Sequence, residues 1–136
     1  MEKIEERFTF GKKERLSGTK RIDALFANGK SFICYPLRVI YLIHEQSEQN
    51  SCSILVSVPK KRIKKAPHRN RIKRLIRESY RLNKGLITKI DMDTKSLDVA
   101  FIYVKDTASD FSDIEKAMQK ALNKIAYHIT KTEKSE

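Results

Sequence analysis

The segment from Lys60 to Lys84 contains twelve lysine and arginine residues and a single acid, Glu78. Its 25 residues therefore hold +11 of the formal net charge of +12. Outside this basic strip, 17 basic residues nearly balance 16 acids. Positive charge concentrated in one short segment predicts that the strip binds a polyanion.

Arginine provides most of the charge in the second half of the strip. Guanidinium groups bind phosphate oxygens in pairs and stack on bases, which an ammonium group cannot do. Asn70 is a weak helix former, so its place between Arg69 and Arg71 predicts a hydrogen bond to a phosphate, ribose or backbone group, with a local structural role as the alternative. The predicted binding residues are Lys60, Lys61, Arg62, Lys64, Lys65, Arg69, Asn70, Arg71, Lys73, Arg74, Arg77 and Arg81.

A helix is predicted to carry the second half of the strip. Pro67 favours a helix start, because its missing N–H costs nothing in the first turn, and Lys84-Gly85 favours a stop after Asn83. At 100° per residue, seven residues form a binding arc: Arg69, Asn70, Lys73, Arg74, Arg77, Tyr80 and Arg81. The opposite, buried arc contains Ile72, Leu75, Ile76, Ser79, Leu82 and Asn83. A solvated face without a ligand is the alternative, but such faces usually mix charges at i,i+4.

The rest of the chain supplies the elements that must position this helix. Apolar spacing and turn signals predict a helix, 19–28, strands at 32–44, 52–58 and 97–104, and a last helix that begins with a Ser112/Glu115 capping box. Pro36 marks a bulge or break in the first strand. The order α-β-β-α-β-α predicts one α+β domain, 14–130, between an N-terminal arm, 1–13, and a disordered tail, 131–136.

Several other classes of protein are disfavoured by the composition. No apolar run is long enough to cross a bilayer and no signal sequence begins the chain, so we expect a soluble, cytoplasmic protein. Cys34 and Cys52 lack metal-ligand spacing and are expected to be reduced core residues, with a disulfide or catalytic role as the alternative. Asp91, Asp93 and Asp98 lie in loops or at strand edges with no histidine nearby in sequence. We therefore predict no catalytic and no metal-binding residue.

Two adjoining sequence motifs carry a family resemblance. Ser57-Val58-Pro59-Lys60-Lys61 is followed by Ala66-Pro67-His68-Arg69-Asn70-Arg71-Ile72-Lys73-Arg74-Leu75-Ile76-Arg77-Glu78. This pattern resembles the Arg-Asn-Arg helix of the bacterial ribonuclease P protein component. Arg15-Leu16 and the segment ending Leu25-Phe26-Ala27-Asn28-Gly29 also look like the family's N-terminal region. The chain departs from the family by having no glycine in the loop before the helix.

The resemblance implies both a fold and a function. The implied fold is similar to the second domain of a small-subunit ribosomal protein, with a left-handed crossover through the basic helix. The implied partners are a catalytic RNA, which uses Mg²⁺ to cleave precursor tRNA, and the single-stranded 5′ leader of that substrate; no stable protein partner is expected. Phe10, Phe26 and Tyr41 are candidate residues of the leader-binding cleft, with burial in the core as their alternative.

Two competing classes share some of these features. A ribosomal or other structural RNA-binding protein could have the same charge and α+β order, but would have no reason to hold this motif. A DNA-binding protein would be expected to place a turn and a supporting helix before the basic helix, where this sequence predicts a strand.

Overall fold

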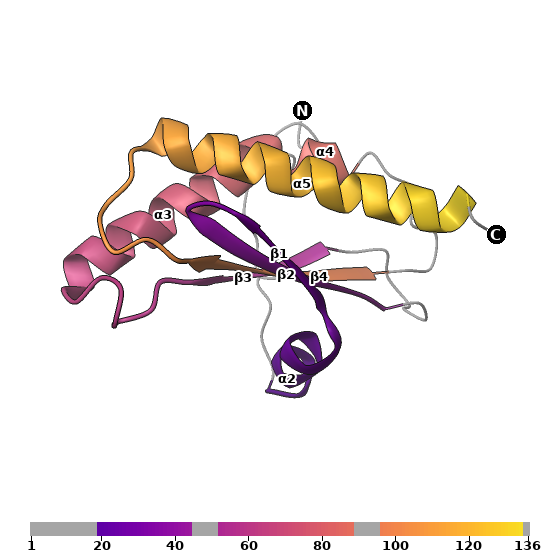
Figure 1. The fold of residues 1–136 in the computed structure, drawn as a ribbon, viewed down its shortest axis with the longest axis horizontal. Helices are drawn as coiled ribbons and strands as arrows, with labels where there is room; N and C mark the ends of the chain where they lie inside the picture. The colour runs from indigo at the N-terminus through magenta and orange to yellow at the C-terminus, as the bar shows by residue number, and fades with distance from the viewer. Residues whose placement is uncertain (1–18, 45–51, 89–95, 135–136) are drawn as a thin grey trace, which may run out of the picture.

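A mixed sheet of four strands, in the order β1-β2-β4-β3, forms the centre of the computed structural model (Figure 1). The structure describes residues 19–44, 52–88 and 96–134, so the predicted arm at 1–13 lies outside the described residues. The elements are α2 (Thr19–Asn28), β1 (Lys30–Cys34), β2 (Leu37–His44), β3 (Cys52–Ser57), α3 (Ala66–Asn83), α4 (Gly85–Thr88), β4 (Ser96–Tyr103) and α5 (Phe111–Lys134). The predicted α+β class is confirmed.

The first predicted strand, 32–44, is in fact a hairpin. β1 and β2 pair antiparallel, with Cys34 opposite Leu37, and a turn at Tyr35-Pro36 joins them through a cis peptide bond. Pro36 therefore separates two strands, because it cannot donate to a sheet ladder. Its carbonyl oxygen accepts a hydrogen bond from the Val104 backbone N–H at 2.9 Å, which attaches the turn to the end of β4.

The basic helix lies in the crossover between two parallel strands. β3 pairs in parallel with β4, and α3 followed by the short α4 connects them. Parallel neighbours need a crossover connection of this kind, usually a helix. The predicted order of strand, basic helix and strand is therefore confirmed.

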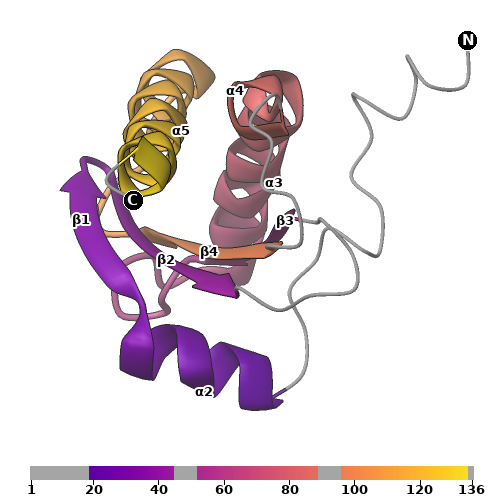
Figure 2. The ribbon, with the colours of Figure 1, turned by 90° about the vertical axis from the view of Figure 1, so that its right-hand side faces the viewer.

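Helices cover both faces of the sheet. Figure 2 shows α3, α4 and α5 on one side and α2 on the other. The larger core, which includes Tyr41, Ile76, Phe101 and Leu122, packs between the sheet and the α3/α5 layer. A smaller cluster of Leu25, Ile40 and Ala100 holds α2 against the opposite face. Covering on both sides explains why both faces of β2 are apolar.

Gly29 follows the last residue of α2 at a position with no room for a side chain. A Cβ atom added there would lie 2.4 Å from the carbonyl oxygen of Leu25 and 2.8 Å from Cγ2 of Ile40. The Gly29 N–H also donates to the Leu25 carbonyl at 2.8 Å. Close approach of α2 to β2 therefore explains why a glycine follows the helix.

The last helix begins earlier and ends later than predicted. The Asp110 carboxylate accepts a hydrogen bond from the Asp113 backbone N–H at 2.9 Å and so caps α5. The predicted Ser112/Glu115 capping box is therefore wrong, and the Glu115 carboxylate instead accepts from the Asn83 amide at 3.1 Å. α5 continues to Lys134, so most of the segment predicted as a tail is helical.

Candidate nucleic-acid interface

The helix α3 presents the basic residues and buries a stripe against the core. Ile72, Ile76, Ser79 and Tyr80 are its buried residues. Tyr80 was predicted on the binding arc, but it is 1% exposed, its ring lies 6.2 Å from that of Phe101, and its hydroxyl donates to Cys52 Sγ at 3.4 Å.

The buried stripe is therefore rotated toward Tyr80. Leu82, predicted as buried, is 42% exposed. Packing against the sheet decides whether a residue at the edge between the buried and exposed faces of α3 is buried. Periodicity alone does not predict this.

The loop before α3 is folded into a turn that supports its lysines. The N–H groups of Arg62 and Ile63 both donate to the Pro59 carbonyl, at 3.0 and 3.2 Å. Ile63 is buried and anchors the turn in the core. Lys60, Lys61, Lys64 and Lys65 are exposed around it. A buried apolar residue in an otherwise basic loop thus fixes where the charges are displayed.

Arg69 joins this loop to the helix. Its Nη1 donates to the carbonyl oxygens of Ile63 at 3.0 Å and Lys64 at 2.7 Å. One of the predicted binding residues therefore has a structural role as well, because its guanidinium group satisfies two loop carbonyls. Arg69 thus helps to hold the loop conformation, together with the hydrogen bonds to the Pro59 carbonyl.

A basic concavity of about 670 Å³ lies beside the loop. Arg62 lines it and forms an ion pair with Asp106 at 3.1 Å, which connects the loop to the segment after β4. The other lining residues are Lys61, Ile63, Lys64, Lys65, His68, Ile72, Thr107 and Ala108. Four cationic side chains against one acid make this space suitable for an anion such as a phosphate group.

The exposed cations of α3 are mostly not neutralised by the protein. Arg71, Lys73, Arg74 and Arg77 have no ion pair with any described residue. Arg81 is paired with Glu78, and this hydrogen bond lowers the pKa of the Glu78 carboxyl group. Asn70 is exposed among these cations. The helix thus offers a surface of guanidinium, ammonium and amide donors, which matches phosphates and riboses.

The predicted leader-binding residues do not come together. Phe10 lies outside the described residues. Phe26 is 48% exposed on α2, whereas Tyr41 is 3% exposed and lies on the opposite face of the sheet. The Tyr41 hydroxyl is hydrogen-bonded to Nδ1 of His128 at 2.7 Å, and burial raises the pKa of Tyr41. Tyr41 is therefore a core residue, the alternative that its position on a strand had left open.

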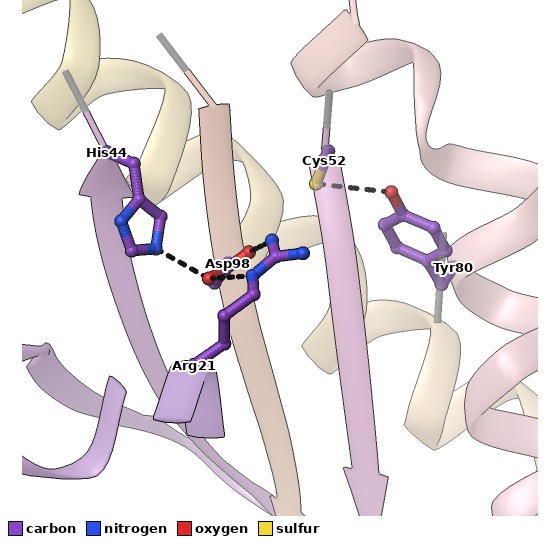
Figure 3. A network of polar contacts seen from close by, with 5 residues as sticks. All are labelled: Arg21, His44, Cys52, Tyr80 and Asp98. Carbon is purple, nitrogen blue, oxygen red and sulfur yellow. Dashed lines mark hydrogen bonds and ion pairs between the residues drawn. The ribbon is translucent and has the colours of Figure 1, made fainter. Parts of the chain in front are cut away.

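A buried carboxylate on the α2 face was missed by the sequence reasoning. Asp98 was expected at a strand edge, but it lies in the central strand β4 and its side chain is fully buried. Its Oδ2 contacts Nε2 of His44 at 2.6 Å and accepts from Nε of Arg21 at 3.3 Å, and Arg21 Nη2 pairs with Oδ1 (Figure 3). The signal available was a single acid inside an apolar strand, which requires a buried partner.

This network attaches α2 to the sheet. Arg21 is on α2, His44 is the last residue of β2, and Asp98 is on β4. A buried carboxylate is stabilised only when charged and hydrogen-bonded partners compensate for its lost hydration. Asp98 therefore fixes the position of α2 relative to the strands, and with it the apolar surface between them.

The apolar surface beside α2 has partly exposed members. Ile22 of α2, Leu42 of β2, Leu55 of β3 and Ile102 of β4 are partly buried and pack around the small α2 cluster. Alternation along β2 places Leu42 on this face and Tyr41 on the other. Half-exposed Phe26 belongs to the same helix.

Residues 19–44, 52–88 and 96–134 contain neither a candidate metal site nor a membrane-spanning helix. No group of three or more His, Cys, Asp or Glu side chains in this part of the chain could hold a metal ion. No helix within it is long and apolar enough to span a membrane. Cys34 and Cys52 form no disulfide, and both are half-buried where they pack against the core.

Comparison with known proteins gives a consistent result. The family model described as ribonuclease P matches residues 10–126. The chain is 44% identical, over 124 residues, to the ribonuclease P protein component of Porphyromonas gingivalis, covering 89% of this chain and 90% of the relative. It is 34% identical over 119 residues to the corresponding protein of Clostridium botulinum strain Loch Maree, covering 86% and 98%.

Solved structures agree with these sequence matches. The ribonuclease P protein from Thermotoga maritima superposes with a TM-score of 0.64 at 26% identity, covering 82% of this chain and 96% of that one. The Staphylococcus aureus protein superposes with a TM-score of 0.63 at 24% identity, covering 83% and 94%, and supports the fold.

Proposed function

This chain belongs to the ribonuclease P protein component family, and on that premise we propose that it binds the RNA subunit of ribonuclease P and the 5′ leader of precursor tRNA. Membership of this family implies a role in tRNA 5′ processing. The hydrolysis is assigned to the RNA with its bound Mg²⁺, and the protein contributes binding and positioning. We place this activity in the cytoplasm.

The observation that carries the proposal is the uncompensated positive surface of α3. Arg71, Lys73, Arg74 and Arg77 form no ion pair with a described acid, since Glu78 pairs with Arg81, and phosphate groups would remove the repulsion between them. Asn70 adds an exposed amide to the same helix. We assign this surface to the RNA subunit, together with the exposed lysines of the preceding loop.

We assign the leader to the α2 face of the sheet. A single strand of varying sequence is best bound by apolar surfaces on which bases stack and by cations that contact the backbone. The apolar surface is formed by Leu42, Leu55, Ile102 and Phe26. In our proposal these residues take the role first given to Tyr41. Ser57, which pairs with Ile102, ends β3 just before the basic loop, so a leader on this face would continue toward Lys60 and Lys61.

The test of the RNA assignment is leader cleavage at low Mg²⁺, with purified ribonuclease P RNA and precursor tRNA. We expect the wild-type protein to stimulate cleavage and Lys73→Ala or Arg77→Ala to reduce that stimulation, since each removes a phosphate contact. Lys30→Gln, a change at an exposed lysine of β1, serves as the control. No stimulation by the wild-type protein would contradict the proposed function.

The leader assignment needs a separate comparison. Affinity is measured for the complex of protein and RNA subunit with precursor tRNA, with and without its leader. Phe26→Ala is expected to weaken binding of the leader-containing substrate by roughly fivefold or more, as for the loss of one stacked base. Tyr41→Phe, on the other face, should leave it unchanged. Equal effects of Phe26→Ala on both substrates would contradict the assignment of the leader to this face.

A further inference from the structure

A second row of cations lies along the β1 side of α5. Lys116, Lys120 and Lys124 follow one another at four-residue intervals, so they share one face of the helix with a rise of about 6 Å between neighbours. All three are exposed, and none forms an ion pair with a described residue. Lys124 Nζ lies 4.6 Å from the centroid of the Phe32 ring on β1. Like charges at this spacing repel unless a ligand neutralises them.

The tip of the β1–β2 hairpin places an aromatic ring beside this row. Tyr35 is 64% exposed at the turn. It borders an open concavity of about 530 Å³ that Lys105, Lys116 and Lys120 also line, with Asp113 as the acid among the lining residues. The remaining lining residues are Ile33, Cys34, Pro36, Ser109 and Ala117.

This surface is separate from the α3 surface. Figure 2 shows α5 above the β1 side of the sheet and α3 above the β3 side. The contacts agree with this arrangement. Lys124 lies over β1, whereas α3 contacts α5 through the side chain of Asn83. The Asn83 amide N–H donates to the Glu115 carboxylate at 3.1 Å, and its Oδ1 accepts from the Gln119 amide at 3.1 Å. A ligand on the lysine row therefore occupies a different flank of the helical layer.

Resting on the proposed function, we propose that the Tyr35 turn and the α5 lysine row form a second RNA-binding surface, which takes an unpaired segment of the RNA subunit. Tyr35 stacks on a base, and the lysines contact successive phosphates. An exposed phenol ring next to uncompensated ammonium groups is the combination that single-stranded nucleic acid requires. An apolar peptide would leave the three lysines unused, and an acidic peptide would not need the exposed ring.

The lysine row is tested by the salt dependence of RNA binding. The affinity for the full RNA subunit, without precursor tRNA, is measured between 50 and 200 mM salt for the wild type and for Lys116→Gln/Lys120→Gln/Lys124→Gln. Each phosphate contact adds about 0.7 to 0.9 to the slope of log K against log salt, so the variant should lose about 2 to 3 of that slope. The ratio of wild-type affinity to variant affinity should therefore fall by roughly twentyfold to fortyfold between 50 and 200 mM salt.

The control is Lys20→Gln, which removes an exposed lysine on α2 and should leave the slope unchanged. Wild-type protein that binds no RNA contradicts the proposed function itself. Wild-type binding with an unchanged slope in the triple variant leaves the proposed function in place and overturns the second surface. Thermal melts establish that the variants are folded, as expected for exposed lysine to glutamine changes.

The aromatic contribution is tested at Tyr35. Tyr35→Phe retains the ring and should keep wild-type affinity, whereas Tyr35→Leu retains only apolar area and should weaken binding by roughly fivefold to a hundredfold. The loss should be absent with a fully double-stranded RNA, whose bases are not available for stacking. Equal affinity of the Phe and Leu variants would overturn the stacking role, and an equal loss on duplex RNA would overturn the choice of an unpaired segment.

Discussion

Charge is treated in opposite ways on the two sides of the sheet. On α3, Arg71, Arg74 and neighbouring cations are displayed without an ion pair to a described residue. On the α2 face, Asp98 is fully buried and is contacted by both Arg21 and His44. One region keeps its charges hydrated and unpaired, and the other removes a charge from water and compensates it within the protein.

The difference separates a binding surface from a structural one. A hydrated cation costs little in the unbound protein and is available to a phosphate group. A buried carboxylate is tolerated only because its partners replace the lost water, and removing a partner leaves an uncompensated charge. Mutations of the unpaired α3 cations should therefore affect RNA binding with little change in stability, and mutations at Asp98 should do the reverse.

The largest effect is expected on α3. In Lys73→Gln/Arg74→Gln/Arg77→Gln, three charge-assisted contacts are lost, so affinity for the RNA subunit should fall on the order of 10²- to 10³-fold at low salt. The slope of log K against log salt should decrease by about 2 to 3. Filter binding at several salt concentrations measures both.

Stability serves as the control for this variant. The three side chains are at least partly exposed, so the free energy of unfolding should change by no more than about 0.5 kcal/mol for each substitution. A large loss of stability would show that α3 uses these cations for folding, and the contrast between the two regions would then disappear.

The second prediction concerns Asp98. Asp98→Asn keeps the shape of the side chain but removes the charge that Arg21 and His44 compensate, and it should lower the free energy of unfolding by about 2–4 kcal/mol. Denaturant unfolding measures this, and the salt slope for the RNA subunit should stay as in the wild type. A loss below about 1 kcal/mol would mean that α2 is held by Leu25 and its apolar neighbours alone.

Arg21 should give a smaller effect than Asp98. Its side chain is 46% exposed, so Arg21→Gln leaves His44 in place and allows water to reach the carboxylate, for a loss of about 1 kcal/mol. The double variant Arg21→Gln/Asp98→Asn should lose less than the sum of the two single variants, because they share one interaction. Additive losses would indicate that the two residues act independently.

Local patterns were sufficient to predict the elements that carry the binding surface. Helix 19–28 is found at Thr19–Asn28, and the basic helix begins and ends within one residue of the prediction. Pro67 and the change of hydrophobic period are local signals for the bounds of a helix, whereas the space at Gly29 is set by β2. The exposure of Arg74 and the burial of Ile72 and Ile76 could be predicted in the same way, because helical periodicity separates the charged face of α3 from its apolar face.

Side-chain partners could not be predicted in this way. Asp98 lies 77 residues from Arg21 and 54 from His44, so only the pairing of β2 with β4 brings the three together. Tyr41 and Tyr80 are amphipathic, and their sequence neighbours do not decide whether the ring is buried or binds a base. Such residues are placed by tertiary packing, which is why Tyr80 was wrongly placed on the exposed arc and Tyr41 was wrongly grouped with Phe26.

The smallest expected effect concerns Glu78, the one position where α3 neutralises its own charge. Glu78→Gln frees the Arg81 guanidinium from its ion pair, and affinity for the RNA subunit should rise by up to about fivefold at low salt, since an exposed pair contributes little. The gain should vanish at high salt. Weaker binding by Glu78→Gln would mean that the pair orients Arg81 for RNA.

The pH dependence of stability gives an independent measurement of the same pair. Arg81 lowers the pKa of Glu78, so the folded state binds this proton less readily than the unfolded chain. The stabilisation is therefore complete above the ordinary pKa of a glutamate and is lost as the pH falls through the lowered value. Wild type and Glu78→Gln should differ in stability at neutral pH and converge in acid, as unfolding curves at several pH values would show. A constant difference would indicate that Glu78 stabilises α3 through packing, and α3 would then contain no compensated charge of the kind found at Asp98.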